Sequence, residues 1–155
     1  MDFYSKHTEL VKKYYNENTQ SFLNYGQGGG QLAIHRAVWG PGVTSRSEAM
    51  YYVHTLIAEY IKNYAPKTVI DLGCGIGGSL FYLSEQFQSN FFGITISEKQ
   101  AEIGKNIAAE KQKDIQIFQG DYADYETWRT YTTESMLAFA IESFIHLAEA
   151  SRFFR

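Results

Sequence analysis

The chain has 155 residues, of which 45% are hydrophobic and 20% charged, and these values predict one compact globular unit. Its net charge of -3 at pH 7, with Lys and Arg scattered along the chain, disfavours nucleic acid and anionic membranes as partners. The single cysteine, Cys74, excludes an internal disulfide and a multi-cysteine metal site. No stretch approaches the roughly 20 apolar residues that span a bilayer, so we expect a soluble, cytoplasmic protein without a membrane span.

Residues 1–65 form an aromatic-rich cap segment, in which we predict two helices separated by a loop. The apolar spacing predicts a short amphipathic helix over residues 5–15. Glycines interrupt residues 22–43, which predicts a loop with at most one helical turn. Ser45 and Glu48 have the spacing of a capping box and predict a second helix, which a proline ends.

Residues 66–155 alternate between short apolar strands and helical stretches. We predict strands over residues 68–72, 91–96, 115–119 and 135–141. Helices are predicted after the glycine turn that follows the first strand, over residues 98–113, and from about Phe144 onward. This alternation predicts parallel crossovers and therefore an α/β fold, a doubly wound Rossmann-like sheet that binds its ligand at the carboxyl ends of the strands.

The stretch V-I-D-L-G-C-G-I-G-G, residues 69–78, contains G-x-G-x-x-G, which alone is a weak signal for a dinucleotide. Asp71 ends the strand two residues before the first glycine, and its carboxylate beside a pyrophosphate would cost about 1 to 4 kcal/mol. A zwitterionic ligand reverses that sign, because its ammonium can meet Asp71 and its carboxylate can meet the amides at the helix start. An NAD-dependent oxidoreductase is thus the disfavoured alternative, and a simple turn-capping role for Asp71 is another.

The motif D-L-G-C-G-I-G-G closely resembles the first motif of the class I S-adenosylmethionine (SAM) dependent methyltransferases. Downstream, G-I-T-I-S-E-K-Q is similar to the second-strand motif of the branch that includes cyclopropane fatty acid synthases and tocopherol or sterol C-methyltransferases. Q-G-D-Y and A-I-E-S-F-I-H resemble the third-strand and fourth-strand motifs of that family. The resemblance covers residues 69–155 and implies SAM as the cofactor, with S-adenosylhomocysteine as its product.

The resemblance also implies cofactor contacts from all four motifs. The implied residues are Asp71, Gly73, Cys74, Gly75 and Gly77 in the first motif, and Thr95, Ile96, Gln100, Asp121, Tyr122 and Ala140 in the later ones. Three of them have simpler alternatives: Cys74 as a small buried filler, Gln100 as the capping-box partner of Ser97, and Asp121 as a turn residue.

Methyl transfer from a sulfonium is a direct displacement, which requires alignment and exclusion of water and needs neither a nucleophilic side chain nor a metal. Glu142 and His146 follow the fourth strand, and either is a candidate for taking a proton from the methyl acceptor. Ile145 stands where the cyclopropane synthases carry a Glu. This difference disfavours cyclopropanation and favours C- or O-methylation of a small, partly apolar acceptor.

The aromatic head of the chain is similar in placement to the segment that covers the SAM site and helps to form the acceptor pocket in this branch. The predicted pocket residues are Tyr14, Tyr25, His35 and Trp39. Aromatic faces would also attract a cationic sulfonium, by about 0.5 to 2 kcal/mol per good contact. Packing between the outer helices is the alternative role for each ring.

The family sheet has seven strands, whereas this sequence supplies about four and leaves the fourth as an apolar edge. We expect a fragment of a longer enzyme, with a strand-borrowing subunit and a truncated gene product as alternatives. The free edge predicts association into a homodimer. A SAM-binding but inactive interaction module is the alternative function from another class.

Overall fold

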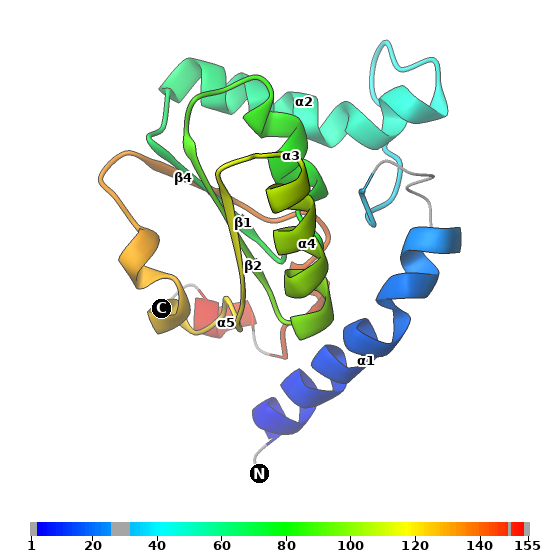
Figure 1. Cartoon of the computed structure of the whole chain (residues 1–155), viewed down its shortest axis with the longest axis vertical. Coiled ribbons are helices and arrows are strands. Elements are labelled where there is room, and N and C mark those ends of the chain that lie inside the picture. Colours follow the sequence, from blue (N-terminus) through cyan, green and yellow to red (C-terminus); the bar gives the residue numbers. More distant parts are fainter. Residues whose placement is uncertain (1–2, 26–31, 149, 154–155) are drawn as a thin grey trace.

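The protein is described by a computed structural model over residues 3–25, 32–148 and 150–153 (Figure 1). Four parallel strands form one sheet in the order β3-β2-β1-β4. Their bounds are β1 (Thr68–Leu72), β2 (Asn90–Thr95), β3 (Ile115–Gln119) and β4 (Met136–Phe139). The predicted α/β fold and its four parallel strands are confirmed, with small shifts at the strand ends.

The described chain also contains five α-helices and three 3-10 turns. The helices are α1 (Phe3–Tyr25), α2 (Arg46–Tyr64), α3 (Gly78–Ser84), α4 (Glu98–Glu110) and α5 (Ala150–Phe153). The turns are η1 (Tyr125–Thr127), η2 (Arg129–Tyr131) and η3 (Phe144–His146). In Figure 1, α2 lies beyond one end of the sheet. The long helix α1 lies beside α4 and is in contact with it. None of the helices described has the length and apolar character needed to cross a membrane.

The second predicted helix is confirmed together with its capping box. The Glu48 N–H donates to the Ser45 hydroxyl at 3.2 Å, and the Ser45 N–H donates back to the Glu48 carboxylate at 3.0 Å. Hydrogen bonds from Thr44 and Ser45 hold the pKa of the Glu48 carboxyl below its usual value. The helix ends where Ala65 adopts a left-handed conformation before Pro66.

The prediction for α1 was too short, because this helix extends to Tyr25 rather than ending at residue 15. Residues 22–25 are therefore helical, although the glycines that follow them had suggested a loop from residue 22. The Phe22 ring packs against Tyr15, with 6.2 Å between ring centroids, so the aromatic face continues along the helix. The glycine-rich centre of the predicted loop, residues 26–31, lies outside the described residues.

The helix expected from about Phe144 is also different in the structure. The Leu147 N–H closes a 3-10 turn on the Phe144 carbonyl at 3.1 Å, and Leu147 then takes an extended conformation that ends the turn. The chain becomes helical again only at Ala150. Phe144 and Phe153 meet edge to face at 5.0 Å between ring centroids, so ring packing holds η3 against α5.

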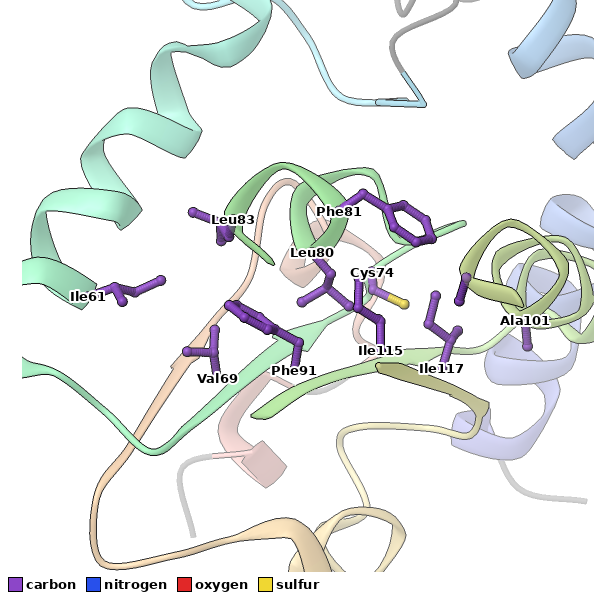
Figure 2. Packing of buried hydrophobic residues seen from close by; sticks show 11 residues of the cluster. Ile61, Val69, Cys74, Leu80, Phe81, Leu83, Phe91, Ala101, Ile115 and Ile117 are labelled. Atoms are coloured by element: carbon purple, nitrogen blue, oxygen red, sulfur yellow. The ribbon is translucent and has the colours of Figure 1, made fainter. Parts of the chain in front are cut away.

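The sheet buries a different hydrophobic cluster on each of its two faces. The first cluster joins α2, α3 and α4 to the sheet through residues such as Ile61, Leu80 and Ile117 (Figure 2). The second lies under the segment with η1 and η2 and contains Ile94 and Trp128. Both faces are therefore covered, as a doubly wound sheet requires, and the carboxyl ends of the strands remain for a ligand site.

We predict that Gly77→Ala destabilises the fold by about 1 to 3 kcal/mol. Gly77 caps α3 at φ 92°, and an added Cβ would lie 2.6 Å from Ile117 Cδ1. The measurement is the urea midpoint of unfolding at unchanged slope.

The matched control is Gly42→Ala, because Gly42 is also left-handed, at φ 80°, and an added Cβ there meets nothing within 4 Å. Only the backbone cost of about 1 kcal/mol is expected in that variant. Equal midpoints for the two variants would show that the contact with Ile117 does not matter.

Candidate functional site

A cavity of about 200 Å³ opens at the carboxyl ends of the strands. Its walls come from the loops after all four strands, from α1 and from residues 32–35. Of the residues predicted from the sequence, those that line it are His35, Asp71, Gly73, Cys74, Gly75, Thr95, Ile96, Gln100, Asp121, Tyr122, Glu142 and His146. Segments far apart in the sequence thus meet at one place, as expected for a doubly wound sheet.

The glycine turn is fastened to the neighbouring strand. The N–H groups of Gly73 and Cys74 both donate to the Ile94 carbonyl at 2.8 Å, so these two amides are not available to a ligand. Gly73 has φ 88°, and a Cβ there would lie 2.3 Å from the Ser143 Cβ. The absence of a side chain at Gly73 therefore lets the turn pass close to Ser143, and this close approach shapes the cavity wall.

Two residues of the predicted cofactor set lie behind the cavity wall. Gly77 packs toward Ile117 in the core, and Ala140 packs with the cluster that contains Ile70. Cys74 lines the cavity but also belongs to the first hydrophobic cluster, and burial raises the pKa of its thiol. Cys74 is therefore placed as a small buried side chain that fills space and not as a reactive thiol.

Asp71 is the most strongly perturbed acid of the site. Its side chain lies at the end of β1 and is only 2% exposed. Among the described residues, none donates a hydrogen bond to its carboxyl group, and burial raises the pKa of that group to about 8. Asp71 is therefore a protonated acid at neutral pH in the free protein, and a bound cation would favour its ionised form.

The Gln100 side chain is oriented toward the cavity by Thr95. The Thr95 hydroxyl donates to Gln100 Oε1 at 2.7 Å, which leaves the amide N–H groups of Gln100 as donors. The Ser97 N–H donates to Thr95 Oγ1 at 3.3 Å instead of to Gln100. Only one half of the alternative capping box is formed, since Gln100 N–H donates to the Ser97 hydroxyl at 3.1 Å.

Helix α1 is attached to the loops that follow β2 and β3. The Ser97 hydroxyl and the Lys99 N–H donate to Asn16 Oδ1, at 2.6 and 3.3 Å. The Tyr4 hydroxyl donates to one Asp121 carboxylate oxygen at 2.5 Å, and the other accepts the Ala123 N–H at 2.9 Å. The turn role of Asp121 is thus formed in addition to its place at the cavity.

Tyr122 presents a buried hydroxyl at the same wall. This hydroxyl lies near Ser143 but forms no hydrogen bond with it. The Ser143 hydroxyl instead donates to the Leu72 carbonyl at 2.6 Å. Burial raises the pKa of Tyr122, so its hydroxyl stays protonated and is a candidate ligand donor.

The loop after β4 pairs with α1 through Tyr15. The hydroxyl of Tyr15 and Nε2 of His146 are 2.7 Å apart, with the rings edge to face. Burial lowers the pKa of His146 and raises that of Tyr15, so both are neutral near pH 7 and the hydroxyl donates to the imidazole. Tyr15 belongs to the aromatic head of the chain but was not selected among its predicted pocket residues, because its spacing with neighbouring apolar residues indicated only a helix face.

Glu142 adopts the left-handed conformation at φ 54° and lies at the open side of the cavity. Its carboxylate accepts the Arg36 N–H at 3.2 Å, which joins the loop after β4 to the segment before α2. The two predicted proton acceptors therefore differ: Glu142 is exposed, whereas His146 is half-buried and hydrogen-bonded.

Three of the four aromatic residues predicted for the acceptor pocket do not line this cavity. Tyr14, Tyr25 and Trp39 are 50%, 87% and 62% exposed. Tyr14 points away because adjacent helical residues face different directions, and Tyr15 takes the inward position. Of the four residues, only His35 lines the cavity.

Sequence analysis also missed a second histidine behind His35. His54 is fully buried on α2, its ring centroid lies 5.0 Å from that of His35, and its Nε2 is 2.9 Å from the Ser79 hydroxyl. Burial lowers the pKa of His54 to about 4, with a smaller effect from His35. Its position on the buried face of α2, one turn after Met50, was the available signal.

The raised pKa of Asp71 predicts a specific pH dependence of stability. The folded protein holds a proton on Asp71 that the unfolded chain loses near pH 4, so this contribution is complete below pH 4 and is lost as the pH rises through 8. Between pH 6.5 and 8 the free energy of unfolding should fall by about 1.6 kcal/mol more in the natural protein than in Asp71→Asn, because the slope of about 1.4 kcal/mol per pH unit halves as the pH reaches 8.

Urea unfolding of both proteins at these pH values measures the difference. The lowered pKa of His54 also makes stability depend on pH in this range, but both proteins carry this histidine, so its contribution cancels in the comparison. Parallel pH profiles for the two proteins would contradict the assignment of a protonated Asp71.

A family model described as a methyltransferase domain matches residues 69–155. The chain is 52% identical over 46 residues to the probable chloroplastic tocopherol O-methyltransferase of Oryza sativa subsp. japonica, a match that covers 30% of this chain and 13% of that protein. It is 33% identical over 103 residues to cycloartenol-C-24-methyltransferase 1 of the same organism, which covers 66% of this chain and 28% of that protein. The chain thus matches only a minor part of either relative.

A solved structure of magnesium protoporphyrin IX methyltransferase from Synechocystis PCC 6803 with bound SAM has a TM-score of 0.65 and 16% identity. This match covers 96% of the chain and 68% of that structure, and it supports the fold. The family model matches more than half of the chain, beginning in β1 and including all four sequence motifs. The chain therefore belongs to the methyltransferase domain family, which confirms its resemblance to the class I SAM-dependent methyltransferases.

Proposed function

We propose that the protein binds SAM in the cavity at the carboxyl ends of the strands and transfers its methyl group to a small, partly apolar acceptor. The observation that carries the proposal is Asp71, an acid buried beside a glycine turn without a hydrogen-bond donor among the described residues. An ammonium group placed there would compensate the cost of ionising the acid. SAM carries such a group at one end and an adenosine at the other.

The remaining walls fit the other parts of SAM in the order of the strands. Gln100 offers amide donors at the cavity wall beyond β2, suited to ribose hydroxyls. Asp121 and Tyr122 follow β3 and suit the adenine. The sulfonium would then face the loop after β4, where Glu142 and His146 lie.

The transfer itself would be a direct displacement. An electron pair of the acceptor forms a bond to the methyl carbon, the carbon–sulfur bond breaks and its electrons stay on sulfur, and S-adenosylhomocysteine leaves with a neutral thioether sulfur. Where the acceptor atom carries a proton, the Tyr15 oxygen can take it while the Tyr15 proton passes to His146 Nε2, 2.7 Å away. Glu142 is the alternative acceptor of that proton.

An inactive SAM-binding interaction module is the alternative function. Methyl transfer to an acceptor distinguishes the two functions, because the module would bind SAM without turnover. A cytoplasmic location also belongs to the proposal; the rice tocopherol enzyme is named as chloroplastic.

Isothermal titration with SAM, S-adenosylhomocysteine and NAD tests the cofactor assignment. We expect both sulfur compounds to bind and NAD not to bind. Gln100→Ala should weaken S-adenosylhomocysteine about 5-fold through the loss of one buried hydrogen bond. The control variant Gln86→Ala alters an exposed residue outside the cavity and should bind as the natural protein does. Binding of NAD alone would refute the proposal.

The proposal includes association of two copies through β4. Among the described strands, β4 lies at the edge of the sheet and pairs with β1 alone. Free strand edges favour pairing with another chain, so we expect a dimer whose fraction rises with concentration. Size-exclusion chromatography with light scattering measures it, and Ala138→Pro on the exposed position of β4 should weaken it. A monodisperse monomer at high concentration would contradict this part.

A further inference from the structure

His35 lines the cavity and, like Tyr122, has a buried polar atom without a hydrogen-bond partner among the described residues. Nδ1 lies 2.9 Å from the Arg36 carbonyl, so in the neutral ring Nδ1–H donates to that oxygen. Nε2 then carries a lone pair. This atom is buried and meets no hydrogen-bond donor among the described residues. A buried acceptor of this kind is costly unless a ligand supplies a donor.

The ring of His35 is held from behind by buried groups. His54 packs against it and is itself fixed by the Ser79 hydroxyl at 2.9 Å. His54 is fully buried and outside the cavity lining, whereas His35 and Ser79 belong to that lining. The position of Nε2 is therefore fixed before a ligand binds, which lowers the entropic cost of forming a hydrogen bond there.

The charges of the cavity narrow the chemistry of the ligand further. Among the described residues that line it, the carboxyl-bearing side chains are Asp71, Asp121 and Glu142, and neither Lys nor Arg contributes to the lining. An acceptor carboxylate or phosphate would find no Lys or Arg side chain in the described lining and would lie near the carboxyl groups of Asp121 and Glu142. Asp71 adds no net charge, because it is protonated in the free protein and would be paired with the ammonium of bound SAM. An uncharged or positively charged acceptor avoids that repulsion.

From these observations, and resting on the proposed methyl transfer, we infer that His35 selects the acceptor: its Nε2 accepts a hydrogen bond from an O–H or N–H group of an uncharged or positively charged acceptor. His35 is thus a specificity-determining residue. Anionic acceptors are excluded by the acidic lining. His35 recognises the donor group of the acceptor and not its apolar body.

Four matched probes test this inference by isothermal titration against the whole chain, with and without S-adenosylhomocysteine. They are 4-propylphenol, its methyl ether 4-propylanisole, 4-propylbenzylamine and 4-propylbenzoate. The phenol should bind about 5-fold more tightly than the ether, since one hydrogen bond is at stake. The benzylamine should also bind, and the benzoate should bind at least about 10-fold more weakly than the phenol because like charges repel in a partly buried site.

Variants of His35 separate the hydrogen bond from packing. His35→Phe should abolish the preference for phenol over ether, whereas His35→Gln should retain part of it through the amide oxygen. Arg36→Ala is the matched control, because the Arg36 backbone rather than its side chain makes the contact with Glu142. Circular dichroism verifies that each variant is folded.

Equal affinity for phenol and ether in the natural protein would overturn the inference, as would a preference that persists in His35→Phe. Absence of phenol binding, or benzoate binding as tight as that of the phenol, would overturn it as well. Titration of S-adenosylhomocysteine itself, before the probes are added, distinguishes the two claims. Failure of S-adenosylhomocysteine itself to bind refutes the proposed function, whereas loss of probe discrimination with S-adenosylhomocysteine bound refutes only the role of His35.

Discussion

The burial of one acid, Asp71, is the constraint on which the site depends. Asp71 ends the central strand and pairs in register with Gly93 on one side and Phe139 on the other, so the sheet itself holds the carboxyl group away from water. Burial without a cation keeps this group protonated near neutral pH. A carboxyl group with such a raised pKa, at the ligand end of the sheet, is suited to bind a positively charged group.

The rest of the cavity is assembled around that position by contacts between distant segments. Ser143 after β4 bonds to the Leu72 carbonyl at the end of β1, and Asn16 on α1 bonds to the start of α4. Tyr15 brings the same helix to the loop after β4. Helix α1 is thus part of the cavity wall, and its polar contacts couple the loops after three strands.

The features predicted correctly from the sequence are those encoded over a few residues. The capping box at Ser45, the glycine turn after Asp71 and the alternation of strands and helices are local patterns, and local patterns persist when the chain folds. The parallel order of the strands followed because crossover connections allow few topologies. The ligand end of the sheet followed from the same topology.

The features that were missed depend on tertiary packing. The extension of α1 beyond residue 15 rests on its aromatic face and its contact with α4, neither of which the glycine-rich sequence that follows it indicates. Tyr14 and Tyr15 are adjacent and chemically identical, so only the docking of the helix decides which faces the cavity. His54 is meaningful only beside His35, a neighbour that the chain reaches through a loop.

The most direct test of the account is the proton balance of SAM binding at pH 6.5, measured by calorimetry in two buffers with different ionisation enthalpies. Asp71 is protonated in the free protein at this pH and must ionise to pair with the ammonium of SAM. The account predicts release of about one proton per SAM bound by the natural protein, and none from Asp71→Asn. SAM binding without proton release by the natural protein would contradict it.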